Sequence, residues 1–360
     1  MNESEPQRDD PEDREHHAGG PARAAVAVDP GDALNCGHEP ERDDEPGHRR
    51  QYAAIATLLA TLLAAFGLAA LAHAADAPNA DAPTGGPGGE LTIAMAVALG
   101  VVQGITEFLP ISSDGHLALG HAVLGMRGAP GGHRFTIVVH AGTLLAVVWT
   151  YRRDLLDLAG TALRPGRDTE NRRLLLAMLV ASVPLGLAVL PGVEDGIIAM
   201  ESNLRWVGVW LWVTAFSLWI GFRHERRHPP ATPGAQPTLR QALIIGLAQV
   251  TAILPGLSRS GTTISAALLV GLDRATAARF SFLISVIAVS GAVAKEVLEI
   301  ALADSDGVAV DVAPLVAGFL TSLVVGLVAL RGLLVLVGRG KVSGFVIYLA
   351  IIGALAIIVG

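Results

Sequence analysis

The sequence predicts an all-α polytopic membrane protein, and two observations carry that prediction. Hydrophobic residues make up 51% of the 360 residues and charged residues only 16%, with a mean hydropathy of +0.50, a balance unlike that of ordinary soluble domains. Uncharged apolar stretches long enough to cross a bilayer recur along residues 91–360. Multiple membrane-spanning helices are therefore expected in this part of the chain.

Charge is distributed unevenly along the chain. Residues 1–51 contain 14 acidic and six basic residues and almost no large apolar ones, so we expect this acidic tail to be disordered. The remaining residues are nearly neutral and lack a basic stripe interleaved with aromatic residues, which argues against a nucleic-acid partner. The single cysteine, Cys36, lies in the tail, which excludes a disulfide framework or a cysteine-based site in the membrane part.

An uncharged segment at 52–75 follows two arginines and ends in Ala72-His73-Ala74. It is long enough for one helical crossing and fits either a cleaved signal peptide or an uncleaved N-terminal transmembrane anchor. The residues ahead of it are unusual for a signal peptide and are also compatible with a misassigned start codon. Residues 76–90 form a turn-prone linker, and 91–360 form the integral-membrane domain.

Six apolar runs are predicted to cross the membrane completely. They cover 134–151, 173–190, 205–222, 278–301, 314–337 and 342–359. The connections after the first, third and fifth runs are rich in basic residues, whereas those after the second and fourth hold at most one. Because positively charged connections stay in the cytoplasm, we expect the arginine-rich side to be cytoplasmic and the C-terminus to lie outside.

Two further apolar stretches, 91–126 and 239–273, are each interrupted by proline and small polar residues. The interruptions read Leu109-Pro-Ile-Ser-Ser-Asp-Gly-His116 and Leu254-Pro-Gly-Leu-Ser-Arg-Ser-Gly-Thr-Thr263. Gly-x-x-Gln precedes both, and Arg-Phe follows both, which indicates an internal repeat. Three spans separate the copies, so we predict an inverted repeat in which each half is a re-entrant helical hairpin plus three transmembrane helices.

The hairpin tips carry the groups that are most informative about function. Non-helical backbone at membrane depth is tolerated only where protein or water surrounds it, so we expect the two tips to meet. The helix that begins at each tip directs free N–H groups toward that point, which favours an anion. Arg259 adds a donor fork suited to phosphate. The first tip and the turn before it contribute Gln103, Glu107, Ser112, Ser113 and His116. Together these groups favour phosphoryl transfer.

These motifs resemble those of the undecaprenyl-diphosphatase family, also called bacitracin-resistance proteins. Gln103-Gly-Ile-Thr-Glu107 matches the family's (E/Q)xxxE motif and continues into its Pro-x-Ser-Ser-x-Gly-His motif. Pro255-Gly-Leu-Ser-Arg-Ser-Gly-Thr-Thr263 matches its PGxSRSxxT motif. The similarity extends over about residues 91–360 and leaves 1–90 uncovered.

The resemblance implies hydrolysis of undecaprenyl diphosphate to undecaprenyl phosphate and inorganic phosphate. This reaction recycles the lipid carrier for peptidoglycan synthesis and confers bacitracin resistance. The resemblance also implies a bacterial cytoplasmic membrane, a site that opens to its outer face, and a divalent cation, Mg²⁺ or Ca²⁺. A homodimer is compatible with the sequence, which does not determine the oligomeric state.

Functional residues are carried over from the family by position. They are Gln103, Glu107, Ser113, His116, Ser258, Arg259 and Thr263. Two positions depart from the family pattern. Gln103 is neutral where many members have Glu, which leaves Glu107 as the metal candidate. Asp114 stands where a small neutral residue is expected, close to the place of a diphosphate.

We hypothesise that Ser113 attacks the terminal phosphorus while His116 accepts its proton, which gives a phosphoserine intermediate. Arg259 and the hairpin N–H groups hold the phosphoryl group in this scheme, and Glu107 holds the cation or acts as an acid or base. Substrate binding is assigned to Gln103, Ser112, Ser258 and Thr263. A water molecule activated by the metal or by His116 is the alternative nucleophile.

Structural roles and a rival function are the alternatives to this hypothesis. Small residues in membrane helices often serve packing, which explains four of them at least as well as a chemical role does: Ser112, Ser260, Ser265 and Gly261. Structural roles are assigned to His121, His133 and His140. Glu107 and Arg259 differ, because ionisable groups at membrane depth are costly and usually functional. A transporter or flippase for a lipid phosphate or another anion is the rival function, since broken helices in inverted repeats are typical of secondary transporters.

Overall fold

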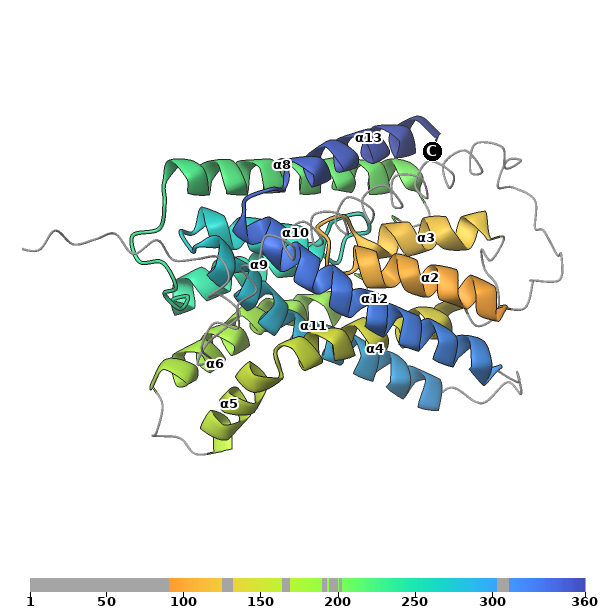
Figure 1. The fold of residues 1–360 in the computed structure, drawn as a ribbon, viewed down its shortest axis with the longest axis horizontal. Coiled ribbons are helices and arrows are strands. Elements are labelled where there is room, and N and C mark those ends of the chain that lie inside the picture. The colour runs from red at the N-terminus through yellow and green to blue at the C-terminus, as the bar shows by residue number, and fades with distance from the viewer. Residues whose placement is uncertain are drawn as a thin grey trace, which may run out of the picture.

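The structure is a computed structural model that describes residues 91–124, 132–163, 169–189, 193, 200, 203–302 and 311–359. The acidic tail (1–51), the hydrophobic segment (52–75) and the linker (76–90) lie outside the described residues. All regular secondary structure in the described part of the chain is helical (Figure 1). The predicted all-α class is therefore confirmed.

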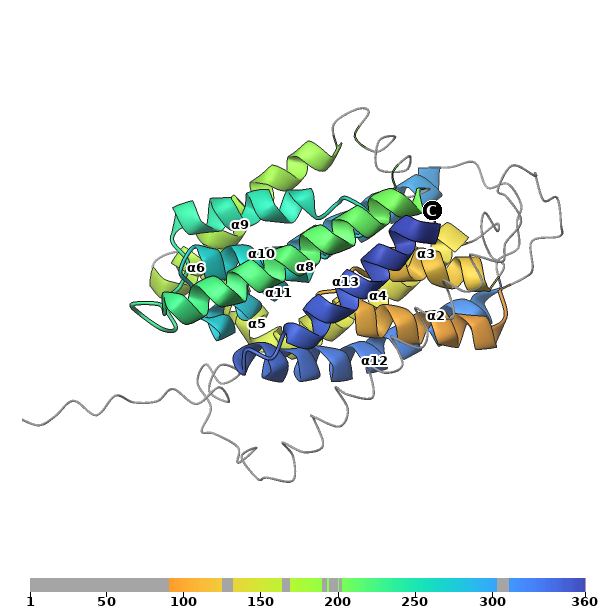
Figure 2. The ribbon, with the colours of Figure 1, turned by 90° about the horizontal axis from the view of Figure 1, so that it is seen from above.

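Two broken helices form hairpins at the predicted positions. The first consists of α2 (Ile93–Thr106) and α3 (Ser113–Val123), and the second of α9 (Leu239–Thr251) and α10 (Arg259–Leu269). Each break contains a Leu-Pro sequence, where proline cannot donate the next helical hydrogen bond. The hairpins lie toward opposite ends of the molecule and point their tips at its middle (Figures 1 and 2).

Among the described residues, four helices are long and apolar enough to cross a membrane, judged by length and composition. They cover Thr169–Ala188, Leu204–Arg227, Arg274–Lys295 and Val312–Gly338. The first combines α6 (Thr169–Ser182) with the 3₁₀ helix η2 (Val183–Val189), and the third lies in α11 (Arg274–Leu302). The second is α8 and the fourth is α12. Pro184 explains the change in helix type within the first span, because it removes a backbone donor.

Two of the six predicted full spans differ from the prediction. Helix α4 (Gly132–Thr150) reaches span length only together with α5 (Arg152–Leu163), from which it is bent by 78°. Helix α13 (Ser343–Val359) has 17 residues and is a shorter apolar helix. The six predicted spans therefore become four candidate spans in the described part of the chain, or five when the bent pair counts as one.

The arginine-rich connection over 152–173 contains α5 and the start of α6. Leu158 on α5 is buried and Leu155 packs against the same core, whereas Arg152 and Arg153 are exposed. An apolar stripe at helical spacing thus stabilises α5 despite its charged residues. The count of basic residues alone did not indicate this helix.

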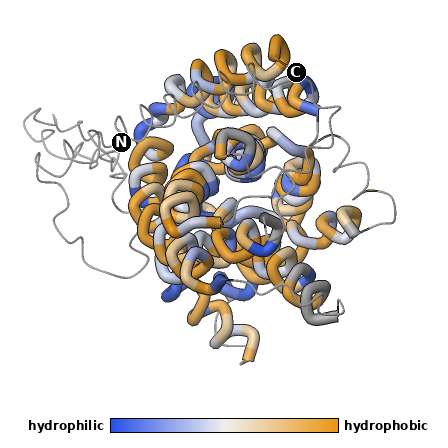
Figure 3. Tube along the Cα trace, turned by 90° about the vertical axis from the view of Figure 1, so that its right-hand side faces the viewer, coloured by the Kyte–Doolittle hydropathy of each residue, from blue (hydrophilic) through white to orange (hydrophobic). Residues whose placement is uncertain are grey.

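Helix pairing connects the two hairpins to the rest of the molecule. Helix α2 packs along α12, and α9 packs along α6. Helices α4 and α11 contact each other, α4 also contacts α12, and α11 also contacts α6. Helices α8 and α13 form a third pair, side by side in Figures 1 and 2. Hydrophobic residues predominate along most of these helices (Figure 3), and large apolar side chains such as Trp149, Phe216 and Leu320 are exposed on their outer faces.

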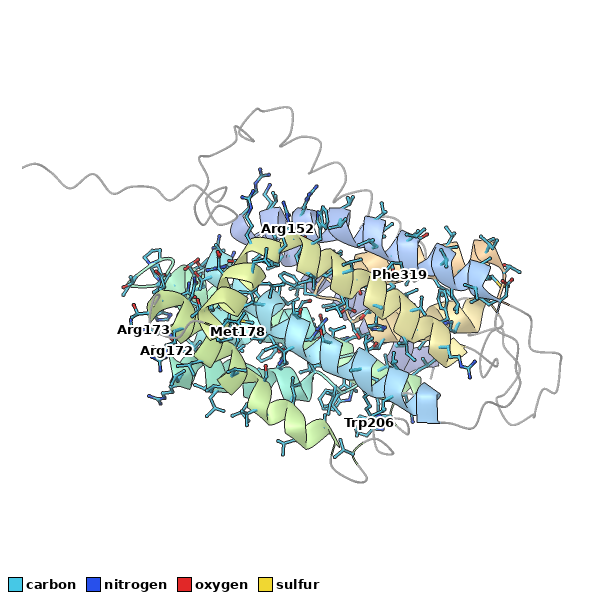
Figure 4. The ribbon with its side chains drawn as sticks, turned by 90° about the horizontal axis from the view of Figure 1, so that it is seen from below. Arg152, Arg172, Arg173, Met178, Trp206 and Phe319 are labelled. Atoms are coloured by element: carbon cyan, nitrogen blue, oxygen red, sulfur yellow. The ribbon has the colours of Figure 1, made fainter. Side chains whose placement is uncertain are left out.

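The basic connections gather at one end of the molecule. The α8–α9 and α12–α13 connections and the facing ends of α5 and α6 lie there, and Arg172 and Arg173 mark that end in Figure 4. Ion pairs join neighbouring helices in the same region, between Arg274 and Glu225 at 2.7 Å and between Arg279 and Asp154. This arrangement matches the expectation that the arginine-rich connections share one face.

Candidate active site

An ion pair joins the two hairpin tips. Glu107 is the C-cap of α2 on the first tip, and Arg259 is the first residue of α10 on the second. The guanidinium Nη2 of Arg259 donates to the carboxylate Oε1 of Glu107. Its other terminal nitrogen lies 3.5 Å from the carbonyl of Ser285 on α11. The expected meeting of an acid and an arginine from the two tips is therefore confirmed.

The second oxygen of Glu107 accepts hydrogen bonds from the first hairpin itself. The Gln103 amide nitrogen donates to Oε2 at 3.0 Å, and the Ser113 hydroxyl donates to the same atom at 2.7 Å. Gln103 and Glu107 are both buried, so these donors compensate the carboxylate charge where water cannot. The i, i+4 contact predicted for this pair is present. The Ser113 hydroxyl thus lies against a carboxylate that can accept its proton.

His140 on α4 completes the group around Glu107. Its Nε2 atom lies 3.7 Å from Glu107 Oε2 and 3.6 Å from Asp114 Oδ1, and its Nδ1 atom contacts the carbonyl of Thr136 at 2.8 Å. Sequence reasoning assigned His140 a structural role. Its position as an ionisable residue inside an apolar run was a signal that could have placed it beside Glu107. Its place also explains Asp114, whose carboxylate faces His140 instead of standing alone.

His116 does not lie against Ser113. Its Nδ1 atom is 2.7 Å from the carbonyl of Ser112, and its Nε2 atom is 2.6 Å from the hydroxyl of Tyr348 on α13. The hydroxyl of Ser113 donates to Glu107 instead. Side chains on a helix lean back toward its N-terminus, which takes the His116 ring to the preceding turn. In this arrangement Glu107, and not His116, lies against the Ser113 hydroxyl.

Two hydroxyl residues on the second tip are predicted to bind substrate. In the structure their hydroxyl groups form hydrogen bonds within their own helix, α10. Ser258 is the N-cap of α10, and its hydroxyl accepts from the N–H of Gly261 at 3.2 Å. Its own N–H donates to the hydroxyl of Thr214 on α8 at 3.0 Å. Thr263 donates to the carbonyl of Arg259 at 2.7 Å, and both predicted residues are buried. They hold Arg259 in place from either side along the chain.

Ser112 enters the site through its backbone. Its φ angle is 71°, and among the described residues no other non-glycine residue has a positive φ. This conformation is uncommon and costly for a residue with a side chain. It turns the chain between the break and α3, so that Ser113 follows directly at the start of the helix.

A divalent cation held by the protein alone does not fit this arrangement. Among the described residues, no group of three or more His, Cys, Asp or Glu side chains is placed to bind a metal ion. Both oxygens of Glu107 already accept from Arg259, Gln103 and Ser113. The amide oxygen of Gln103 is the one acceptor of this group without a partner in the described part of the chain, and Mg²⁺ or Ca²⁺ needs about six oxygen ligands.

The residues around the tips can perform nucleophilic displacement at phosphorus. Ser113 supplies a hydroxyl with an adjacent carboxylate, and Arg259 supplies a cation that is permanently charged and geometrically matched to phosphate. Arg259 is the first residue of α10, so its backbone stands at the positive end of the helix dipole, where an anion is favoured. Hydrogen bonds within the first hairpin and the ion pair between hairpins keep these groups together.

Comparison with known proteins places the chain in one family. The family model for bacitracin resistance protein BacA matches residues 96–355. An undecaprenyl-diphosphatase of Korarchaeum cryptofilum is 40% identical over 279 residues, which cover 73% of this chain and 97% of that protein. Undecaprenyl-diphosphatases of Rubrobacter xylanophilus and Christiangramia forsetii are 39% and 36% identical, covering 74% and 73% of this chain and 97% and 96% of their own lengths. The chain belongs to the bacitracin resistance protein BacA family.

Proposed function

We propose that this protein hydrolyses undecaprenyl diphosphate to undecaprenyl phosphate and inorganic phosphate. The reaction recycles the lipid carrier for peptidoglycan synthesis and lowers the amount of diphosphate available to bacitracin. One observation carries the proposal: the Ser113 hydroxyl lies 2.7 Å from a carboxylate oxygen of Glu107, whose other oxygen binds Arg259 of the opposite hairpin. The names of the relatives support the substrate.

The chemistry proceeds in two displacements. Ser113 Oγ bonds to the terminal phosphorus, its proton passes to Glu107 Oε2, and the bond from that phosphorus to the bridging oxygen breaks. Undecaprenyl phosphate leaves with that oxygen. The departing bridging oxygen takes the proton from Glu107. Water then bonds to the phosphorus of the phosphoserine and gives a proton to Glu107, the bond between Ser113 Oγ and phosphorus breaks, and Oγ takes up that proton as inorganic phosphate leaves. Arg259 moves from Glu107 to the phosphoryl oxygens and stabilises the charge that develops on them.

The remaining predicted residues support this scheme from outside the reacting atoms. Gln103 orients Glu107 through its amide N–H, and the backbone of Ser112 positions Ser113. Ser258 and Thr263 keep Arg259 at the start of α10. Dependence on Mg²⁺ or Ca²⁺ stays part of the proposal, although the residues at the tips do not by themselves fit such an ion, because both oxygens of Glu107 accept from donors.

The proposal includes the inverted repeat and the orientation in the cytoplasmic membrane. Helices at equivalent positions in the two halves, α2 and α9, α4 and α11, and α12 and α6, make equivalent contacts. Helix α2 contacts α12 as α9 contacts α6, and α4 contacts α12 as α11 contacts α6. A Cβ added at Gly100 would lie 2.8 Å from the Gly318 carbonyl oxygen, and one added at Gly246 would lie 2.2 Å from that of Ala181. Both glycines thus permit a close helix contact in the same place of each half. The hairpins are re-entrant in this arrangement, and the site opens to the outer face.

Phosphate release from undecaprenyl diphosphate by detergent-purified protein tests the function. The assay compares the wild type with Ser113→Ala and Arg259→Ala, with and without EDTA, after a folding check by size-exclusion chromatography and thermal unfolding. We expect release that depends on the cation and is lost in both variants. A phosphoenzyme trapped with radiolabelled substrate in the wild type and absent from Ser113→Ala would establish the covalent route.

The same experiment addresses the rival function. Two hairpins that approach the middle from opposite ends are also an arrangement suited to a carrier. A folded wild type that binds the diphosphate and releases no phosphate would contradict the enzyme. Transport of the labelled lipid across liposomes would then identify a flippase for lipid phosphates.

A further inference from the structure

Tyr348 on the last helix contributes a hydroxyl to the first hairpin. It lies 2.6 Å from Nε2 of His116, whose other ring nitrogen lies 2.7 Å from the Ser112 carbonyl. A carbonyl oxygen can only accept, so Nδ1 of His116 carries the proton and donates it. In the neutral ring Nε2 is then the acceptor, and the Tyr348 O–H donates. The two rings also stack, with centroids 5.8 Å apart and an angle of 19° between their planes.

The end of this hydrogen-bond chain is the strained backbone beside the nucleophile. Ser112 has a φ of 71° and is buried, and such a conformation persists only where its surroundings enforce it. His116 enforces it at one atom, because its ring Nδ1 at 2.7 Å and its backbone N–H at 3.4 Å both donate to the Ser112 carbonyl. His116 is itself almost fully buried, so Tyr348 satisfies a ring nitrogen that water does not reach.

We propose that Tyr348 is a positioning residue for the phosphatase reaction. It fixes the tautomer and orientation of His116, His116 holds the left-handed turn at Ser112, and that turn directs the Ser113 hydroxyl to Glu107. Helix α13 thereby becomes part of the site, although the family motifs all lie on the hairpins. The inference rests on the proposed function, because the quantity that Tyr348 controls is the reactivity of Ser113.

A conservative substitution tests the role of the hydroxyl. Tyr348→Phe keeps the ring and its stacking on His116 and removes only the O–H donor. Loss of the partner that orients a metal-binding histidine costs about 10- to 100-fold in metal affinity or activity. By analogy we expect kcat to fall by about tenfold with KM little changed. Tyr151→Phe is the matched control. Tyr151 is buried and also stacks on an aromatic ring, that of Phe282, and its substitution is expected to leave kcat unchanged.

Two substitutions of His116 separate positioning from base catalysis. Asn in place of His116 brings an amide N–H to the position of Nδ1, from which it can donate to the Ser112 carbonyl, whereas Gln extends its amide to the position of Nε2. We expect His116→Asn to retain at least about tenfold more activity than His116→Gln. We also expect Tyr348→Phe to have no further effect when added to His116→Asn, because the two act in one chain.

The outcomes distinguish this inference from the proposed function. No phosphate release by the folded wild type contradicts the function itself. With an active wild type, a Tyr348→Phe protein as active as the Tyr151→Phe control overturns the role of Tyr348. Equal and complete loss in His116→Asn and His116→Gln, with additive effects of Tyr348→Phe, overturns it as well and returns His116 to the role of a base.

Discussion

The two hairpin tips begin as near copies in sequence and differ in what their side chains do. Ser113 and Ser258 occupy matching positions after Leu-Pro. On the second tip the serine caps its own helix, whereas on the first the serine hydroxyl donates across the break to Glu107. In the proposed mechanism the first tip therefore carries the reactive group. The second tip presents a well-capped helix start with Arg259, and it can serve as an anion clamp without taking part in bond formation.

The comparison between the two serines gives the largest expected effect. Ser113→Ala removes the nucleophile and should lower kcat by on the order of 10³-fold or more. Ser258→Ala removes an N-cap, which costs about 1 kcal/mol of stability, and should lower kcat by less than about tenfold. Phosphate release and thermal unfolding measured on both variants check the two halves of the prediction. Equal losses of kcat would show that the tips share the chemistry.

The residues after the serines carry opposite charges, Asp114 on the first tip and Arg259 on the second. Arg259→Gln should lower kcat by about 10²- to 10³-fold, because the donor that stabilises developing charge is lost. Asp114→Asn should change it by only a few-fold, since the Asp114 carboxylate contacts His140 and is half-exposed or more. Steady-state kinetics of both folded variants provide the measurement. A larger loss of kcat in Asp114→Asn would show that the Asp114 carboxylate takes part in the reaction, which the proposed mechanism does not include.

Much of the fold was predictable because the relevant signals are local. Proline with small polar residues broke each apolar stretch where the helices end, and basic connections gathered at one end. Helix α5 could not be found from charge counting, since its stability depends on the burial of Leu155 and Leu158 against other helices. Length alone did not show that Gly132–Thr150 bends sharply into α5.

The candidate site was predictable in its membership and less so in its contacts. Costly ionisable groups at membrane depth pointed to Glu107 and Arg259, which do meet. Spacing of three residues suggested that His116 faces Ser113, but rotamer and tertiary context turn its ring to Tyr348. Tyr348 and His140 come from helices distant in sequence, and no motif in a single sequence links them to the tips.

Substitutions that change the backbone conformation at the tips are expected to have smaller effects than those of Ser113 and Arg259, and mainly on stability. Gly256 has a φ of 96°, and an added Cβ would lie 2.5 Å from the carbonyl oxygen of Val207. Gly256→Ala should therefore destabilise the protein by about 1–3 kcal/mol. On the first tip Ser112→Gly removes the cost of a positive φ and should therefore not lower the thermal midpoint. It should lower kcat, because the position of Ser113 is then less well fixed. A less stable Ser112→Gly protein would show that this turn is fixed by packing and not by the His116 contact.

The end of the second hairpin far from its tip gives the smallest effect, and it concerns pH. Asp273 precedes α11 outside the membrane-spanning segments, where its carboxylate accepts from the N–H of Gly234 at 2.7 Å and from Thr276 at 3.0 and 2.7 Å. Burial by itself raises the pKa of Asp273, but these hydrogen bonds outweigh it and hold the pKa below its ordinary value. The stabilisation is then fully present above the unfolded-state pKa and is lost as the pH falls through the folded-state pKa.

Asp273→Asn should lower the thermal midpoint at pH 7 and leave phosphate release nearly unchanged, because the carboxylate anchors the hairpin end and does not touch the tips. The difference in thermal midpoint between the variant and the wild type should become smaller at a pH below the ordinary aspartate pKa, because Asp273 of the wild type then becomes protonated. Asp157→Asn on the exposed face of α5 is the matched control. A stability difference that stays constant down to low pH would mean that Asp273 acts through its shape and not through its charge.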